Sequence, residues 1–527
     1  MGSGRRDQTS KGCGSARRPG YACVAIACTA LLGLPAQAQV PSPEEMFERL
    51  QRLEKRQAAQ DEQLKAQEEQ LKAKDARIDD LEGELKQLKG QEAAPAPDAT
   101  PGAAVAADAT PIPDAQELGE VVAGEDYETF FGNYSPGRGF GLVRTDLGEV
   151  RFGIYTYVRY LNSTGVDDTY VNGLGQEVKI DKRNDIELNK VKIEFRGWLL
   201  DPKFQYVLYS WTNNAAMGQG AQVVLGGNVK YAFSDAFLLG AGILSLPTTR
   251  STSGNFPYWL AVDHRTAADE FFRGSYATGV FAYGKPLERT AYYVMLANNL
   301  SQLGVDAAQQ DAELTTFSGA LWWMPTTGEF GPRSGFGDFE HHTDLATRLG
   351  VHFTFSPEDR QSQPGADDID NTQIRLSNGT IIFTPGALAP GVAVRDVKYY
   401  MTDLDAGFKY RGFALEGEYY LRWLNDIEAD GPIPVDQMFD HGFQLLASSM
   451  LWPQTVQAYS MNSYIFGEFG DSWETTAGLN WWIFRRRELR LNLEYIYAHQ
   501  SPIGYTAVPQ LVGATGSIFS TNLEMSF

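Results

Sequence analysis

The sequence predicts an all-β protein, a 16-stranded antiparallel transmembrane β-barrel preceded by an N-terminal α-helical coiled coil. Three observations predict this architecture. A heptad pattern ends near residue 90, and an alternation of apolar and polar residues begins near residue 149. The connections between the alternating segments are short and long in alternation. A chain of 527 residues is long enough for one large barrel.

Residues 1–38 have the pattern of a secretion signal peptide. Five basic residues precede the apolar stretch "YACVAIACTALLGLP", and "AQA" ends in Ala38, a small-residue cleavage point. The alternative interpretation of this segment is a membrane anchor. All three cysteines lie in it, so the mature chain would hold no disulfide, no thiolate metal site and no cysteine nucleophile.

Residues 43–90 keep one heptad register over six heptads. Leucine or isoleucine fills most a positions, and position e is always acidic. The pattern predicts a parallel coiled coil, with a solvated single helix as the alternative. Its length would be roughly 70 Å, and self-association would make the protein an oligomer, for which we favour a homotrimer. Residues 91–120 are rich in Ala and Pro without periodicity and predict a linker.

Residues 145–527 carry the alternation that predicts the barrel. In "VRFGIYTYVRY", Val150, Phe152 and Ile154 oppose Arg151 and Tyr155, and "LNKVKIEFRGWLL" repeats the pattern. A charged face that recurs strand after strand does not fit a buried sandwich core, but it fits a watery lumen inside a lipid-facing wall. The chain ends on "STNLEMSF", which has the same alternation and would close the barrel.

Sixteen strands fit this alternation, and their connections nearly alternate in length. The exception is 325–342, which should be a short turn; either the count slips there or that turn is elaborated. The segment 372–383 resembles a strand but is placed in the long loop 357–396. The predicted strands are residues 150–161, 187–199, 203–211, 222–233, 237–246, 268–283, 287–299, 314–324, 343–356, 397–410, 411–424, 440–451, 454–467, 473–484, 487–499 and 515–527.

Several motifs follow the signal, heptads and linker in this barrel region: "VKIEFRGWLLDPKFQYVLYSW", "GAGILSLPTTRSTSG", "ADEFFRGSYATGVFAYG" and "DLDAGFKYRGFALEGEYY". Together they resemble the phosphate-selective porin O and P family of Gram-negative outer membranes. The resemblance implies a homotrimer of pores in the outer membrane, with the coiled coil in the periplasm. It also implies that loops fold inward, including the loop after the fifth strand, and that basic side chains conduct anions.

The candidate anion path consists of basic residues on the predicted lumen face and in the inward loops. Five of them come from the first two strands and would be neighbours, whereas the alternative is that they form cross-strand ion pairs with Glu194 and its neighbours. The predicted lumen holds eight bases against six acids, which is a weak anion filter. The candidate lining residues are Arg151, Arg159, Lys190, Lys192, Arg196, Arg250, Arg273 and Arg348. Arg422 and Arg490 complete the predicted lumen bases, and Asp344, Glu194, Glu416, Glu418, Glu488 and Glu494 are the acids.

The remaining features favour a channel over an enzyme. The six histidines form no metal-binding pair, no nucleophile elbow or phosphate cradle is present, and no cofactor is expected. The acidic composition excludes nucleic acid as a partner. The aromatic stretches "LWWMP", "NWWIF" and "YYLRWL" predict an interfacial girdle, with sugar stacking as the alternative.

The predicted function is therefore passive diffusion of small anionic or polar solutes across the outer membrane, with phosphate selectivity as its most specific form. One alternative is a carbohydrate or general diffusion channel. The other is a structural anchor in outer-membrane lipid, whose coiled coil contacts peptidoglycan or a periplasmic protein. A barrel of sixteen strands favours an open lumen, because eight strands suffice for an anchor filled by side chains.

Overall fold

The computed structural model describes residues 133–135, 137–213, 222–253, 257–301, 313–332, 335–360, 369, 371–504 and 509–527. The predicted signal peptide, coiled coil and linker lie outside these residues. In the described part, no helix is long and apolar enough to cross a membrane.

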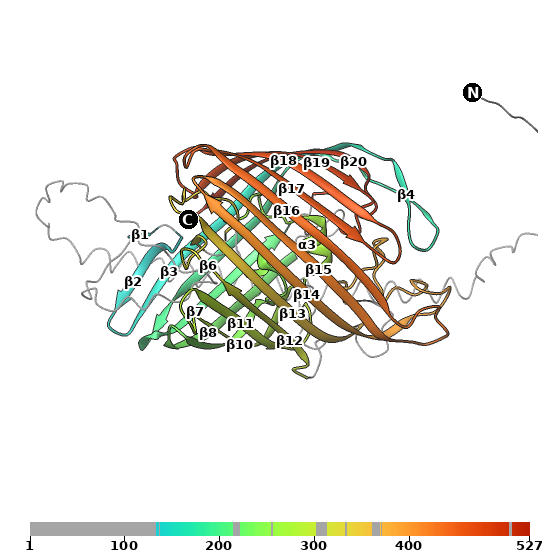
Figure 1. The fold of residues 1–527 in the computed structure, drawn as a ribbon, viewed down its shortest axis with the longest axis horizontal. Coiled ribbons are helices and arrows are strands. Elements are labelled where there is room, and N and C mark those ends of the chain that lie inside the picture. The colour runs from blue at the N-terminus through green and yellow to red at the C-terminus, as the bar shows by residue number, and fades with distance from the viewer. Residues whose placement is uncertain are drawn as a thin grey trace, which may run out of the picture. The chain divides into compact units, whose positions relative to one another are not determined.

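Sixteen of the described strands form one closed antiparallel barrel (Figure 1). Each strand pairs with the next one along the chain, and the first and last strands, β3 and β20, pair with each other to close it. The barrel strands are β3 (Gly148–Val166), β6 (Asn184–Leu199), β7 (Asp201–Asn213), β8 (Gln222–Ser234), β9 (Phe237–Ser245), β10 (Tyr276–Gly284), β11 (Thr290–Ala297), β12 (Thr316–Trp323), β13 (Ala346–Asp359), β14 (Val394–Tyr410), β15 (Phe413–Ala429), β16 (Met438–Trp452), β17 (Val456–Phe466), β18 (Ser472–Trp482), β19 (Leu489–His499) and β20 (Gly516–Ser526).

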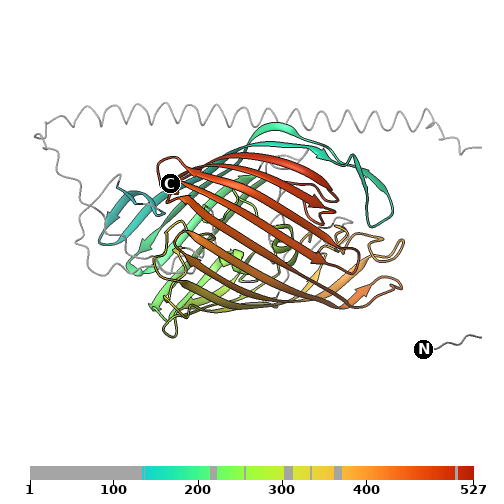
Figure 2. The ribbon, with the colours of Figure 1, turned by 45° about the horizontal axis from the view of Figure 1, so that its top comes forward.

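The other described elements are short. They are β1 (Tyr134–Ser135), β2 (Gly139–Thr145), β4 (Thr169–Val171), β5 (Glu177–Lys179), α2 (Arg250–Ser253) and α3 (Ala267–Phe272). β2 pairs with the start of β3 on the same edge that β20 occupies further along. The Ile154 amide donates to the Phe527 carbonyl oxygen at 2.6 Å, so β20 ends where β2 takes over this edge. Figure 2 shows β2 and β3 reaching past the end of β20.

The prediction of a 16-stranded barrel is confirmed. The predicted strand 268–283 is wrong in its first part, where the chain forms α3 and the strand begins only at Tyr276. Phe271 and Phe272 are 3% and 0% exposed, and adjacent residues of a strand could not both point into the same interior. A helix can bury both, and the Thr266 side chain caps it by accepting from the Asp269 amide.

The connections have two kinds, as the sequence predicts, and they define two ends of the barrel. At the short-turn end, Arg411 (φ 49°) and Gly412 (φ 85°) form a two-residue turn between β14 and β15. Positive φ at both positions is what a tight hairpin with matching twist requires. The exception at 325–342 is an elaborated turn and not a slip in the count, because β12 and β13 still pair directly. The other end is the long-loop end.

The outer face of the barrel is apolar. On β13, Leu349, Val351 and Phe353 are 41–49% exposed, whereas Arg348 and His352 on the inner face are at most 1% exposed. An apolar exterior of this kind suits the hydrocarbon of a bilayer, because all barrel backbone groups are paired within the closed sheet.

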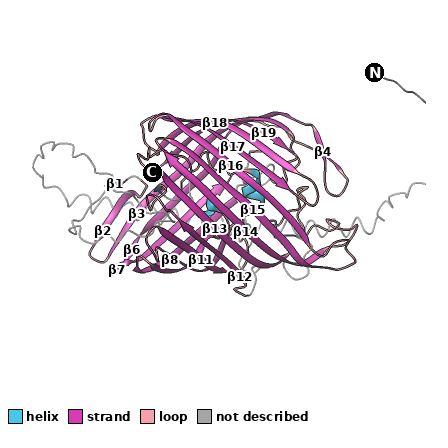
Figure 3. Ribbon diagram, viewed as in Figure 1, coloured by secondary structure: helices cyan, strands magenta, loops and turns pink. Residues whose placement is uncertain are grey.

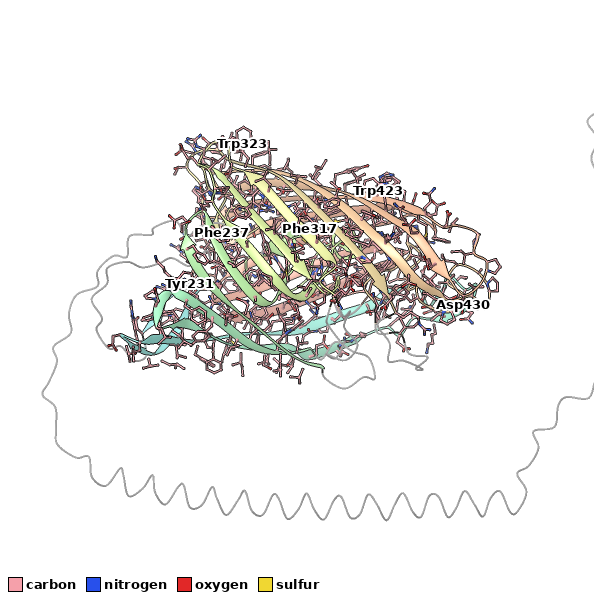
Figure 4. All side chains as sticks on the ribbon, turned by 90° about the horizontal axis from the view of Figure 1, so that it is seen from below. Tyr231, Phe237, Phe317, Trp323, Trp423 and Asp430 are labelled. Atoms are coloured by element: carbon pink, nitrogen blue, oxygen red, sulfur yellow. The ribbon has the colours of Figure 1, made fainter. Side chains whose placement is uncertain are left out.

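Aromatic side chains mark the outer surface near the strand ends. In Figure 4, Trp323 lies at one end of the face shown and Asp430 at the other. Trp323 and Trp481 are about half exposed at the short-turn end, whereas their neighbours Trp322 and Trp482 point inward and are 1% exposed. Each predicted aromatic stretch with paired tryptophans is thus split, one ring in the girdle position and one inside.

Candidate solute path

The connection between β9 and β10, residues 246–275, folds into the barrel, and we call it the inner loop. At one side of the lumen, the Arg250 guanidinium pairs with Glu416 at 2.5 Å. At the other side, Asp263 pairs with the Lys190 ammonium at 2.5 Å. Helix α3 of the inner loop lies among the strands in Figure 3 and contacts β15 to β18. The inward folding that the resemblance implies for this loop is confirmed.

His264 fixes the inner loop to β19. Its Nε2 lies 2.9 Å from Glu494 Oε2, and the imidazole is 4% exposed. Burial lowers the pKa of His264, but the Glu494 carboxylate outweighs burial, and the pKa lies above its usual value. The raised pKa favours the charged form of His264 beside the Glu494 carboxylate.

A second segment enters from the opposite end. Residues 324–345, between β12 and β13, fold inward from the short-turn end, and we call them the inner turn. The Lys409 ammonium donates to the carbonyl oxygens of Phe330 and Gly335, each at 2.7 Å. The Phe336 amide donates to the Tyr258 carbonyl oxygen at 2.9 Å, so the inner turn meets the inner loop inside the barrel.

The inner face of β13 to β20 is packed against these two segments, and we call it the packed wall. Three arginines of this wall form ion pairs with carboxylates on the neighbouring strand: Arg348–Asp405 at 2.8 Å, Arg422–Asp440 at 2.6 Å and Arg490–Glu524 at 2.7 Å. All three arginine side chains are at most 1% exposed. The charged groups of these three pairs are therefore held inside the protein, away from water.

The long loop between β13 and β14, residues 360–393, adds to this packing at the long-loop end. Ile374, Leu376, Ile382 and Phe383 are at most 1% exposed in the main apolar cluster. The segment 372–383 forms an isolated bridge and no barrel strand, so its placement in the loop is confirmed.

The inner faces of β6 and β7 differ, and we call them the open wall. The side chains of Lys192 and Arg196 are 11% and 17% exposed. The Lys192 ammonium lies 4.9 Å from the centre of the Tyr209 ring, and the Lys190 ammonium lies 4.3 Å from that of Trp211. Cations alternate with rings along this wall, a surface that remains charged and in partial contact with water.

A cavity of about 460 Å³ begins at the foot of the open wall, at the short-turn end. We call it the basic vestibule, because six basic side chains line it: Arg138, Lys192, Arg196, Arg485, Arg486 and Arg487. Glu194, Glu340 and Glu488 line it as well, together with the C-terminal Phe527. The C-terminal Phe527 pairs with Ile154 of β3, and Ile154 lines the cavity too (the C-terminus is marked in Figure 1).

Five of the predicted lining residues lie on β3 and β6. Arg151 pairs with Glu149 at 2.9 Å, and Arg159 donates to Asn522 Oδ1 at 2.7 Å and to the carbonyl oxygen of Val262 in the inner loop at 2.9 Å. Both are 5% exposed. The two guanidinium groups therefore stabilise the fold at two positions along β3, the strand that closes the barrel with β20.

The other three, Lys190, Lys192 and Arg196, face the interior from β6. Lys192 and Arg196 share the Glu194 carboxylate, at 2.6 Å from the Lys192 ammonium and 2.6 Å from Arg196 Nε. Glu194 thus contacts both of these cations on the open wall. These two residues reach the cavity, whereas Lys190 is 6% exposed beside Asp263.

The remaining candidates lie elsewhere. Arg250 is in the inner loop beside Glu416, and Arg348 belongs to the packed wall. Arg273 follows α3, where it pairs with Glu270 and donates to the Gly274 carbonyl oxygen at 2.7 Å. The structure therefore brings only Lys192 and Arg196 of the predicted set to the cavity.

The buried side chains of the described barrel strands show no surplus of basic residues. Eight basic and eleven acidic side chains are buried, and the partly exposed Lys192 and Arg196 add two bases. Sequence reasoning missed Asp403, Asp405, Asp440 and Glu524, although each keeps the alternation of its strand and could have been counted from it. In the described ranges, no group of three or more His, Cys, Asp or Glu could hold a metal ion.

No protein-family model and no curated protein sequence matches the chain, so the resemblance to the phosphate-selective porins stays a prediction. Solved structures do match. An anion-selective porin from Comamonas acidovorans is 13% identical, with 72% of this chain and 100% of that one covered and a TM-score of 0.44. The outer membrane channel DcaP of Acinetobacter baumannii is 8% identical over 74% of this chain and 99% of that one, with a TM-score of 0.44.

Salmonella typhi OmpF in complex with daunomycin is 9% identical over 72% of this chain and 98% of that one, with a TM-score of 0.42. Similarity at this level carries no argument about what this chain conducts. The barrel itself is established by the pairing of its own strands.

Proposed function

We propose that this protein is an outer-membrane channel through which small polar and anionic solutes diffuse passively. The observation that carries the proposal is a closed 16-stranded barrel with an apolar exterior and a charged interior that is only partly filled. In such barrels the short turns and both chain ends face the periplasm, so the basic vestibule would open to the periplasm.

The proposed route follows the open wall. Solute would pass from the basic vestibule to Lys192 and Arg196, then beside Tyr209 and Trp211 towards the long-loop end. Lys192 and Arg196 keep partial contact with water and would make this passage favour anions, because the local field decides selectivity more than the summed charge of the lumen does. Phosphate, a small anion that binds arginine well, is the most specific solute that we propose.

The heptad pattern of residues 43–90 bears on how the chains assemble. We propose a homotrimer in outer-membrane lipid, with residues 43–90 as a periplasmic coiled coil that joins the three chains. Its charged surface would contact peptidoglycan or a periplasmic protein.

The experiment is the reversal potential of the purified full-length mature protein in a planar bilayer across a potassium chloride gradient, followed by titration with phosphate. We expect moderate anion selectivity and a fall in chloride current as phosphate is added. Cation selectivity would contradict the proposed route, because the route passes Lys192 and Arg196.

One second function has an observation in its favour. The packed wall fills much of the lumen, as expected of a barrel that serves as a membrane anchor. An anchor would conduct no ions in the same bilayer experiment, whereas loss of the coiled coil would loosen the attachment of the outer membrane in cells. Conductance of the reconstituted protein decides between the two functions.

A further inference from the structure

The basic vestibule holds three arginines without an ion partner. Arg487 pairs with Glu340 at 2.8 Å, and Glu194 is shared by Lys192 and Arg196. The remaining bases, Arg138, Arg485 and Arg486, form no ion pair or side-chain hydrogen bond with the described residues, and all three are exposed.

The vestibule carboxylates do not balance these three cations. Glu488 accepts a hydrogen bond from the Tyr134 hydroxyl at 2.8 Å, and the Phe527 carboxylate is the only other anion beside Glu194 and Glu340 among the described lining residues. Six bases against three side-chain carboxylates and one terminal carboxylate leave an excess of positive charge. A cavity with such an excess attracts an anionic occupant.

The chain itself supplies a strongly acidic segment next to this cavity. Residues 108–132, which directly precede the described part, contain seven carboxylates and no basic residue. By contrast, residues 43–90 mix ten bases with thirteen acids, so they carry little net charge to offer. The seven acids are Asp108, Asp114, Glu117, Glu120, Glu125, Asp126 and Glu128.

Chain length places these acids within reach. The described chain begins at Asn133, and Gly137 and Arg138 already line the vestibule. Glu125 is eight residues before Asn133, and an extended chain spans at most about 3.3–3.6 Å per residue, so Glu125 can lie at any distance up to roughly 28 Å from that point. A short tether also gives the acids a local concentration in the millimolar range.

We propose that the acidic segment 114–128 of this chain binds in the basic vestibule and pairs with Arg138, Arg485 and Arg486. A volume of about 460 Å³ admits a few residues and not a folded domain, which suits one stretch of extended chain. The occupant neutralises the arginines that a solute would otherwise meet at this mouth. Because these ion pairs are exposed, salt weakens them strongly.

The test is a cross-link in the full-length mature protein. Glu125→Cys is combined with Ser526→Cys, since Ser526 lines the vestibule without contributing charge and the mature chain has no other cysteine once the signal is removed. A short bismaleimide is applied at about 0.05 M and at about 1 M KCl, where the screening length falls to roughly 3 Å. We expect a yield several-fold higher at low salt. The readout does not depend on conductance, so it stands apart from the test of the proposed function.

Two matched variants separate binding from mere tethering. Leu147→Cys replaces Ser526→Cys in the control, since Leu147 is 63% exposed at the same end and is not a vestibule residue; its yield should not change with salt. The second variant keeps the original cysteine pair and combines Arg138→Gln, Arg485→Gln and Arg486→Gln. It should reduce the cross-linking yield at low salt to the value at high salt.

Three outcomes would overturn the proposal. One is no cross-link at low salt. Another is a yield indifferent to salt and to the three glutamines, which would mean that the tether alone brings the cysteines together. The third is a cross-link that forms only between chains carrying one cysteine each, which would assign the vestibule to the segment of a neighbouring copy.

Discussion

The two walls of this barrel are built from the same alternation of residues, but their charged side chains differ in contact with water. On the packed wall, Arg348 and Arg490 are at most 1% exposed and each has its own carboxylate. On the open wall, Lys192 and Arg196 share one carboxylate and keep contact with water. The strands do not cause this difference. The inner loop and inner turn lie against one wall and leave the other partly free.

Lumen charge therefore has two uses in one barrel. Where a charged pair is buried, removing one partner leaves an uncompensated charge and is costly. Where a charge touches water, it contributes little to stability but acts on passing ions. Variants on the two walls should therefore fail in different measurements.

Removing the inner turn should have the largest effect. Replacing residues 326–343 by Asn-Gly would leave β12 and β13 joined by a short loop and free the space beside Lys409. We expect single-channel conductance to rise on the order of two- to fivefold, because the inner turn occupies lumen that a barrel of sixteen strands would otherwise leave to water. Deleting the hairpin of β4 and β5, which lies in a long loop, is the matched control and should leave conductance unchanged. An unaltered conductance after removal of the inner turn would show that this segment does not obstruct the lumen.

Breaking a pair on the packed wall should reduce stability most among single substitutions. Arg490→Met leaves Glu524 buried without its partner, which should cost about 3–5 kcal/mol in the free energy of unfolding. Urea unfolding in detergent measures this, and Arg490→Met with Glu524→Gln should recover much of the loss. A loss below about 1 kcal/mol would place Glu524 in contact with water, contrary to the packing.

Changing the open wall should mainly alter selectivity. Lys192→Gln with Arg196→Gln removes both cations beside Glu194, so the remaining carboxylate should shift the reversal potential towards cations. The free energy of unfolding should fall less than in Arg490→Met, because Lys192 and Arg196 keep partial contact with water, although Glu194 is buried and loses both cations. Lys203→Gln, an exposed base at the same end outside the vestibule, is the control. The same reversal potential in both variants would show that ions do not pass along the open wall.

The smallest effect expected is the pH dependence of the inner turn. Burial lowers the pKa of His342, but its bonds to Asp338 and Glu329 outweigh burial and raise the pKa to about 9. The raised pKa means that the charged histidine stabilises the fold fully below its unfolded pKa, and that this contribution is lost as the pH rises through about 9. The wild type should lose its advantage of about 1–3 °C in melting temperature over His342→Gln between pH 6 and pH 10. An advantage that persists at pH 10 would mean that the histidine acts without its charge.

The sequence predicted the strands well because the alternation of β structure is local. All sixteen strands could be placed, and the one partial error lies where Phe271 and Phe272 are adjacent, a pattern that alternation cannot explain and that points to a helix. The elaborated turn was recognised only as an irregularity. Its three phenylalanines, Phe330, Phe336 and Phe339, were a usable signal, because a turn in water has no use for them and all three are at most 8% exposed.

The partners of the charged residues could not be predicted from the sequence. Lys190 pairs with Asp263 and Arg250 with Glu416, and both pairs depend on how the inner loop crosses the lumen. No periodicity along a strand encodes that crossing. The eight candidate residues were therefore identified as inward or loop-borne cations, but only the fold separates Lys192 and Arg196 from those held in the interior.

The most direct test of the account is to record current while single cysteines on the two walls react with a bulky charged thiol reagent. Val207 lies half-buried on the open wall between Arg196 and Asn228, and Ser520 is 0% exposed on the packed wall. Modification should reduce the current through Val207→Cys and leave that through Ser520→Cys unchanged. A reduced current through Ser520→Cys with no change at Val207→Cys would place the solute path along the other wall and contradict the account.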